Sequence, residues 1–280
     1  MNRHFLNVFI CVGLFQSYGM AQELHRVMTW NLKWFPGGKT STQETATAHI
    51  EAFRKEVKRI SPDFLILQEV ATQAAIDEAL KPLDSNWQTV VISNFKQGGY
   101  IAGQQIAIAA KISGDRSWVA PWEKGWANAP RGYAFAAFKI NGRSLALYGL
   151  HLKSNLGNSL ENTSKREDAV QQLMAHIAVE EAQSGKFDHI VIAGDFNTDD
   201  PDSPFAQAKG ERTFAKLTDG GFFWTFSGVG HENRITCPGN GRYPDASFDH
   251  IFTRGLGNPI SRVIKASGSD HYPVLVDISH

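Results

Sequence analysis

Asp195 and Asn197 stand two residues apart in the stretch IAGDFNTD, directly after an apolar run at 190–192. Such a pair is common in a turn at the end of a strand, because Asp and Asn side chains hydrogen-bond their own backbone. The pair also has a chemical interpretation, since carboxylate and amide oxygens are ligands that hard metal ions prefer. Partners elsewhere in the chain decide between the two interpretations.

Side chains of the same kinds lie at the ends of other apolar runs. They are Asn31 after VMTW, Glu69 in FLILQE, His151 in LALYGLH, Asp249 in FDHIF, and Asp270 with His271 in SGSDHYPV. We expect one rim of a sheet to gather them. Carboxylates and amides suit Mg²⁺ or Mn²⁺. The sequence has neither the cysteine cluster nor the H-E-x-x-H motif that would indicate zinc.

A metal ion, a histidine and an aspartate together favour hydrolysis of a phosphate ester. This reaction requires charge to be neutralised on the phosphoryl oxygens, a water to be oriented for attack, and the leaving oxygen to be stabilised. Histidines beside acids add proton transfer or charge stabilisation near neutral pH.

Short β-rich runs must position these residues. They cover residues 25–32, 63–70, 87–93, 105–111, 133–140, 144–152, 188–194, 222–226, 248–252, 261–266 and 273–278. Several are apolar almost throughout, which is typical of strands buried on both faces. Asn141 and Gly142, between two of these runs, predict a hairpin.

Helical spacing of apolar residues predicts three helices, over residues 44–60, 71–80 and 163–183. We expect the last to begin with a cap near Thr163 or Ser164 and to be closed by Gly185. The stretch that holds Trp118, Trp122 and Trp126 is expected to be a loop because it also contains prolines and a glycine.

The 280 residues are 42% hydrophobic and show no repeat, low-complexity segment or linker, so we expect one domain with sheets packed face to face and helices outside. Lys plus Arg and Asp plus Glu both number 28. Binding to nucleic acid would therefore need a local basic patch.

The N-terminus resembles a secretory signal peptide. Arg3 precedes an apolar stretch at 5–15, and Gly19-Met20-Ala21 fits a cleavage site. We expect residues 1–21 to be removed, 22–280 to form the mature domain, and the protein to be secreted or periplasmic. Only Cys237 would then remain, so no internal disulfide could form.

The motifs TWNL, LQEV, GLHLKS, GDFN, FDHIF and SDHYPV occur in the order found in the endonuclease/exonuclease/phosphatase superfamily, which the chain resembles from about Val27 to Ile278. Pancreatic-type deoxyribonucleases, secreted sphingomyelinases and inositol phosphatases belong to it. The resemblance implies an α/β fold, a four-layered α/β sandwich in which two packed, mostly antiparallel sheets are flanked by helices. It also implies hydrolysis that depends on Mg²⁺, with Mn²⁺ as an alternative.

The resemblance also implies a role for each motif residue. The catalytic residues would be His151 at the phosphate or leaving group, Asp195 as the group that orients or deprotonates water, Asn197, Asp249 and His271. Asn197 and Arg131 would bind the phosphate of the substrate, His271 would act as an imidazolium, and Asp249 would orient it. The residues on the metal side would be Asn31, Glu69 and Asp270.

One position departs from the pattern of apurinic endonucleases, which carry an acid where this chain has Lys33. We therefore expect an exported nuclease of low specificity on DNA or RNA, acting as a monomer. A phospholipid or sphingomyelin phosphodiesterase, or a phosphomonoesterase, would use the same residues. Exposed tryptophans would favour a lipid substrate, and a basic groove would favour nucleic acid.

Overall fold

The computed structural model describes residues 23–97, 100–101, 103–123, 131–200, 203 and 210–279. The predicted signal peptide and Trp126 lie outside these residues. The cleavage site and the domain boundary at residue 22 therefore stay predictions.

Two six-stranded sheets form the centre of the fold. Sheet I has the strand order β13 (Ser261–Val263), β14 (Val274–Ser279), β1 (Leu24–Phe35), β2 (Phe64–Val70), β6 (Gln105–Ala110), β3 (Gln88–Ile92). Sheet II has the strand order β11 (Phe223–Trp224), β12 (Asp249–Arg254), β10 (His189–Asp195), β9 (Arg143–His151), β8 (Gly132–Ile140), β7 (Arg116–Pro121). The short strands β4 (Lys96–Gln97) and β5 (Tyr100–Ile101) pair separately.

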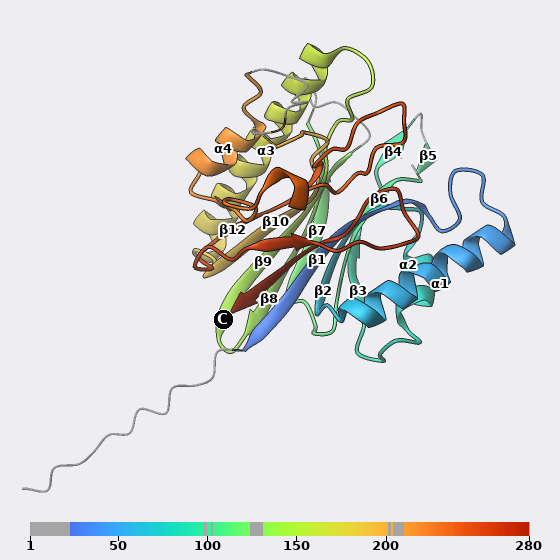
Figure 1. Cartoon of the computed structure of the whole chain (residues 1–280). Helices are drawn as coiled ribbons and strands as arrows, with labels where there is room; N and C mark the ends of the chain where they lie inside the picture. Colours follow the sequence, from blue (N-terminus) through green and yellow to red (C-terminus); the bar gives the residue numbers. More distant parts are fainter. Residues whose placement is uncertain are drawn as a thin grey trace, which may run out of the picture.

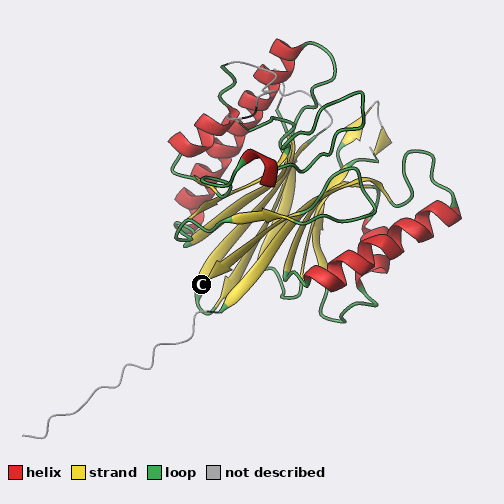
Figure 2. Ribbon diagram, viewed as in Figure 1, coloured by secondary structure: helices red, strands yellow, loops and turns green. Residues whose placement is uncertain are grey.

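Helices cover the outer face of each sheet (Figures 1 and 2). The helices α1 (Gln43–Ile60) and α2 (Gln73–Leu80) lie against sheet I, and α3 (Ser159–Ser184) and α4 (Thr213–Asp219) lie against sheet II. A short 3₁₀ helix, η1, covers His231–Asn233.

Three apolar clusters fill the spaces between these four layers. One lies between the sheets and includes Ile66 of sheet I and Val191 of sheet II. The second joins sheet II to α3, and the third joins sheet I to α1. Burial of apolar surface is the main stabilising contribution to such a fold. The prediction of a four-layered α/β sandwich with two mostly antiparallel sheets is confirmed, because β1–β2 and β9–β10 are the parallel pairs among the strand pairs described.

Two local predictions were correct. Asn141 and Gly142 connect β8 to β9 with φ angles of 49° and 84°, as a two-residue hairpin turn requires. The cap Gly185 ends α3, as predicted.

Other local predictions were wrong. The helix α3 begins four residues before Thr163, because the side chain of Asn158 caps it by accepting a hydrogen bond from the Glu161 amide. The stretch around Trp118 is not a loop but the edge strand β7. Pro121 is its last residue, where a missing N–H group is tolerated.

Two tryptophans of this stretch, Trp118 and Trp122, pack on the protein body. The ring of Trp118 lies 4.3 Å from that of Phe135, and Trp122 is buried against Tyr133. Neither ring is therefore a free platform for a lipid or a base. Among the helices of the described residues, none combines the length and the apolar character that crossing a membrane requires.

Candidate active site

The register of sheet II places three of the predicted residues side by side at one rim. Asp195 ends β10 and is paired with His151, which ends the parallel strand β9. On its other side Asp195 is paired with Asp249, which begins the antiparallel strand β12. Parallel strands end at the same edge of a sheet, so the order of strands alone brings these side chains together.

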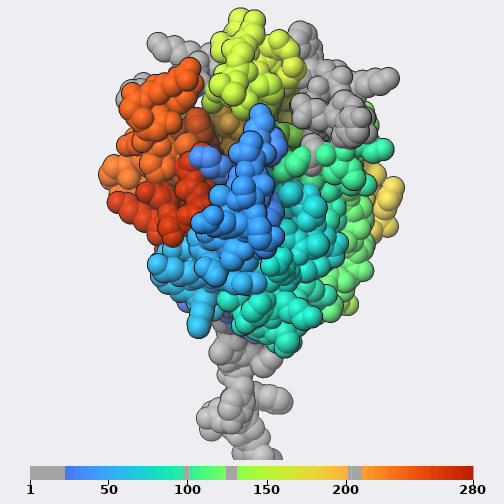
Figure 3. All heavy atoms as spheres, turned by 90° about the vertical axis from the view of Figure 1, so that its right-hand side faces the viewer, coloured from blue at the N-terminus to red at the C-terminus, as the bar shows by residue number. Residues whose placement is uncertain are grey.

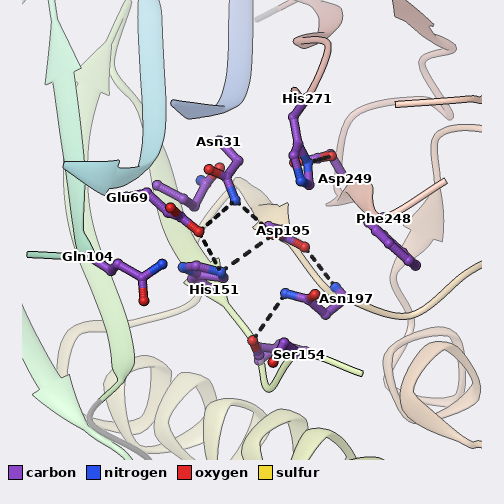
Figure 4. A network of polar contacts seen from close by, with 12 residues as sticks. Asn31, Glu69, Gln104, His151, Ser154, Asp195, Asn197, Phe248, Asp249 and His271 are labelled. Carbon is purple, nitrogen blue, oxygen red and sulfur yellow. Dashed lines mark hydrogen bonds and ion pairs between the residues drawn. The ribbon is translucent and has the colours of Figure 1, made fainter. Parts of the chain in front are cut away.

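Sheet I presents its residues at the same rim. Asn31 lies near the end of β1 and is paired with Gln68, the neighbour of Glu69 on β2. Figure 4 shows Asn31, Glu69, His151 and Asp195 pointing toward one another across the two sheets. The loops that follow β1 and β9 border this rim. Figure 3 shows the segment that contains the second of them and the start of α3, in yellow-green, above the blue N-terminal segment.

Irregular backbone conformations orient the side chains of Glu69 and Asn197. Glu69 has φ of 60° and lies where the register of β2 shifts, so a bulge turns its carboxylate out of the strand pattern. Asn197 has φ of 51°. Such conformations cost on the order of 1–3 kcal/mol each in residues other than glycine, and they cluster at functional sites.

Gly194 explains why a glycine precedes Asp195. Its φ is 150°, and a Cβ atom there would lie 2.0 Å from the carbonyl oxygen of Leu150. The close approach of β9 and β10 at the rim therefore excludes any side chain at this position.

A hydrogen-bond network connects the carboxylates (Figure 4). Asn31 Nδ2 donates to Asp195 Oδ2 at 2.9 Å and lies 3.4 Å from Glu69 Oε1. His151 Nε2 lies 3.4 Å from Asp195 Oδ2 and 3.8 Å from Glu69 Oε1. The backbone amide of Asn197 donates to the second oxygen of Asp195 at 2.8 Å.

His271 and Asp249 form a second unit beside this network. Nδ1 of His271 lies 2.7 Å from Asp249 Oδ2, and the Asp249 side chain is fully buried. Ser269 holds the loop in place, because its hydroxyl donates to the Asn31 carbonyl and accepts from the His271 amide. The indole of Trp30 donates to the carbonyl of His271 at 2.9 Å.

Burial and charge set different protonation states for the two histidines. Burial, with the charges of Arg131 and His271, holds the pKa of His151 well below its usual range, so His151 is neutral. Burial also lowers the pKa of His271. The charge and the hydrogen bond of Asp249 outweigh this effect and raise the pKa well above its usual range. His271 is therefore an imidazolium at neutral pH.

Asp195 is poised for proton transfer. Burial and the charge of Asp249 raise its pKa to about 7, although His271 and the hydrogen bond from Asn31 oppose this effect. A carboxylate with a pKa near the working pH is suited to act as a general base.

The donor set fits a divalent cation. Glu69 and Asp195 present carboxylate oxygens that suit Mg²⁺ or Mn²⁺, and three carboxylates converge where Asp249 is included. The Asn31 side chain turns its NH2 group to these carboxylates, and its Oδ1 accepts from the Lys33 amide. Within the described part of the chain, Asp249 Oδ1 is buried without a hydrogen-bond partner. Asp195, Asp249 and His271 could also group around an ion, with ligand atoms within 4.8 Å of one another. A protonated His271 is not a ligand, so the Glu69 carboxylate is the better metal ligand, and the assignment of Asn31 to the metal stays a prediction.

Arg131 lies at the rim as predicted. Its guanidinium donates to the Leu152 carbonyl and lies 3.4 Å from Gln104 Oε1. Burial lowers its pKa, and the charges of Asp195 and Glu69 raise it. The group stays charged, since a guanidinium is not deprotonated in proteins.

Asp270 lies apart from the network. Its carboxylate forms an ion pair with Lys33 at 2.8 Å, and both side chains are about half exposed. The structure therefore does not bring Asp270 to Glu69 and Asn31, and its assignment as a metal ligand stays a prediction. Lys153 points to backbone carbonyls of its own loop. His250 is buried on the opposite face of β12 and contacts the carbonyls of Thr198 and Ser247, in agreement with strand alternation.

Sequence reasoning missed several residues that support the site. Ser269 connects β1 to His271, and Asn155 donates to the carbonyl of Asn197 at 2.8 Å. Both lie within a few residues of a recognised motif, which was the available signal. Their partners come from distant segments, so the sequence alone did not reveal the contacts.

Comparison with known proteins identifies the class. The model of the Endonuclease/Exonuclease/phosphatase family matches residues 28–271, and the chain belongs to that family. It is therefore a phosphoesterase of this family, whose enzymes typically depend on a divalent metal.

The sequence identities between this chain and individual proteins are low. The chain is 26% identical to UPF0294 protein VP2298 of Vibrio parahaemolyticus over 232 residues, covering 81% of this chain and 72% of that protein. An endonuclease/exonuclease/phosphatase family protein from Bacteroides thetaiotaomicron is similar in structure with a TM-score of 0.70 at 17% identity, covering 92% of this chain and 98% of that one. The mannosyl-6-phosphatase Bt3783 of the same organism gives a TM-score of 0.68 at 17% identity, covering 90% and 98%. At such identities the solved structures establish the shared fold.

Proposed function

We propose that this protein is an exported phosphodiesterase that uses Mg²⁺, or Mn²⁺ in its place, and cleaves DNA or RNA with little base specificity. The observation that carries this proposal is the pairing at the rim of a buried base, Asp195, with an imidazolium, His271, held by Asp249. Its export rests on the signal peptide predicted over residues 1–21.

The charge of the site supports a diester over a monoester. Three carboxylates, Glu69, Asp195 and Asp249, face one guanidinium, Arg131, and one imidazolium, His271. With Asp195 ionised, this set carries one net negative charge, which a bound divalent cation would convert into one net positive charge. A phosphodiester carries a single negative charge and matches it, whereas a monoester dianion would leave an excess.

Asp195 is the residue that prepares the attacking water. The Asn31 amide and the Asn197 backbone amide each hold one of its oxygens, so the carboxylate has a fixed orientation. Its deprotonated form accepts a proton from water as the water attacks phosphorus. His151, which is neutral and buried, keeps Asp195 and Glu69 in place.

His271 supplies charge stabilisation to the phosphate. As an imidazolium it donates a hydrogen bond from Nε2 to a phosphoryl oxygen, while Nδ1 stays on Asp249. The Asn197 side chain and the Arg131 guanidinium are positioned to hold the remaining oxygens, Asn197 by its amide and Arg131 by a charge-assisted hydrogen bond. A divalent cation held by the Glu69 carboxylate, beside Asn31, would supply Lewis-acid stabilisation of developing negative charge.

The substrate class is tested with two esters that share one leaving group. We expect bis-p-nitrophenyl phosphate to be hydrolysed with a higher kcat/KM than p-nitrophenyl phosphate, in the presence of Mg²⁺. Asp195→Asn, which keeps the shape of the base, serves as the control for contaminating activity. A preference for the monoester would contradict the assignment as a phosphodiesterase.

A phosphomonoesterase is the second candidate. The similarity in fold to the mannosyl-6-phosphatase of Bacteroides thetaiotaomicron favours it. A phospholipid or sphingomyelin phosphodiesterase would use the same residues. The positions of Trp118, which is partly buried, and Trp122, which is buried, give it no support, because these rings pack on the protein body.

A further inference from the structure

Arg166 is a buried charge outside the catalytic rim. It lies on α3, its side chain is 2% exposed, and its guanidinium forms two hydrogen bonds to Glu211, at 2.8 and 2.6 Å. It also donates to the carbonyl of Lys153 and to Asn155 Oδ1, both at 3.0 Å. Well-packed apolar residues often stabilise a fold as well as a buried ion pair does, so stability alone does not explain this arginine, and the groups that it positions are informative.

Two hydrogen-bonding partners of Arg166, Asn155 and Glu211, contact the segment of the rim formed by Asn197 and Thr198. On one side, Asn155 Nδ2 donates to the carbonyl oxygen of Asn197 at 2.8 Å. On the other side, the hydroxyl of Thr198 donates to Glu211 Oε1. The peptide that joins Asn197 to Thr198 is therefore held from both sides by groups that Arg166 fixes.

This peptide needs such support. Asn197 has φ of 51°, a left-handed conformation that is strained in residues other than glycine, although asparagine tolerates it better than most. The same conformation directs the Asn197 amide to Asp195 Oδ1 at 2.8 Å and the Asn197 side chain to the Leu152 carbonyl at 3.3 Å. The backbone conformation of Asn197 thus sets both the hydrogen bond to the base and the direction of the proposed phosphate-binding side chain.

We propose that Asn155, held by Arg166, is a positioning residue that fixes Asn197 and, through it, the carboxylate of Asp195. This inference rests on the proposed function, because it assigns Asn155 a part in the same hydrolysis. Asn155 touches neither the substrate nor the attacking water, and it acts through the carbonyl of Asn197.

The substitution Asn155→Asp separates positioning from packing. The aspartate keeps the size of the side chain and still accepts from Arg166, but it has no N–H to donate to the Asn197 carbonyl. We expect kcat for bis-p-nitrophenyl phosphate to fall by about 10-fold or more, which corresponds to roughly 1.4 kcal/mol in the barrier. We expect KM to change by less than about threefold, with a folded protein.

Asn162→Asp is the matched control. Asn162 is buried on α3 and donates to the carbonyl of Leu156 in the same loop, without a hydrogen bond to Asn197. We expect this variant to keep kcat within about twofold of the wild type. In an Asn197→Ala background, Asn155→Asp should cause little further loss, because a residue that acts through Asn197 is non-additive with it.

Amide hydrogen exchange measures how firmly the Asn197 backbone is held, and this measurement does not depend on catalytic activity. We expect the Asn197 amide to exchange faster in Asn155→Asp than in Asn162→Asp, because its hydrogen bond to Asp195 is loosened. An active wild type whose Asn155→Asp variant keeps full kcat and unchanged exchange would overturn the proposal. A wild type inactive on every phosphate ester would instead refute the proposed function, and the exchange rates would still decide the positioning.

Discussion

Replacing Asp249 by asparagine removes the charge that faces the His271 imidazole while keeping the shape of the side chain. The two groups lie 2.7 Å apart, and Asp249 is fully buried. A hydrogen bond to a charged group contributes roughly 1.5–3 kcal/mol. Because this free energy favours the charged imidazole, we expect the substitution to lower the pKa of His271.

The change should move both sides of the pH profile. His271 acts as an imidazolium, so activity falls as the pH rises through its pKa, and this limb moves to lower pH in Asp249→Asn. Asp249 is also the charge that, after burial, raises the pKa of Asp195 to about 7. Without it, Asp195 loses its proton at lower pH, and the acidic limb moves in the same direction.

The free energy of unfolding should depend on pH in a direction that the pKa of His271 determines. The folded pKa of His271 lies above that of an unfolded histidine. Its ion pair therefore stabilises the fold fully below the unfolded pKa of about 6.5, and this stabilisation is lost as the pH rises through the folded value. In Asp249→Asn we expect the free energy of unfolding to lose this dependence on pH.

Two measurements check the prediction. Heteronuclear NMR of the His271 ring in metal-free protein reports its pKa directly, and steady-state rates across pH report both limbs. Asp277→Asn is the control, since Asp277 pairs with Arg262 on sheet I away from the rim. A His271 pKa and a pH profile that match the wild type would refute the role assigned to Asp249.

Three further predictions follow from single contacts. Because Asp195 has a pKa of about 7, the binding of Mg²⁺ or Mn²⁺ at pH 7 should release protons. The heat of binding measured by calorimetry should therefore differ between buffers of different ionisation enthalpy. Equal heats would contradict a protonated Asp195. Arg131→Gln should lower kcat/KM by about 10-fold or more through loss of a charge-assisted hydrogen bond, as steady-state kinetics would show, and full activity would remove Arg131 from the substrate. Gly194→Ala should lower the free energy of unfolding, measured in urea, by more than about 2 kcal/mol, because its Cβ would meet the Leu150 carbonyl. Gly142→Ala has open space around its Cβ, so it should lower the free energy of unfolding by only roughly 1 kcal/mol.

The sequence predicted that several polar residues gather at one rim because they sit at the ends of apolar strands. Asp195 and His151 end neighbouring parallel strands, so their meeting follows from strand order once the fold is known. The resemblance carried by the motifs predicted a four-layered sandwich, and the structure confirms this fold. Helix α1 was also predicted closely, since Pro62 marks its end and apolar periodicity marks its buried face.

Other features were not predictable, because they depend on contacts between distant segments. The bulge at Glu69 and the left-handed Asn197 are backbone conformations that residue type does not encode. Asp270 was assigned to the metal from its motif, but the side chain of Lys33, far away in sequence, pairs with it. Likewise, the link between Asn155 and Asn197 appears only when the loop after β9 is placed beside β10.

The most direct test of the account is nicking of supercoiled plasmid by the purified protein with Mg²⁺, with EDTA, and with the His271→Ala variant. The account predicts nicking that requires the metal and falls by several orders of magnitude in a folded His271→Ala protein. A variant that is folded and equally active would contradict the assignment of His271 and the mechanism with it. Absence of nicking by folded wild-type protein would contradict the nuclease assignment.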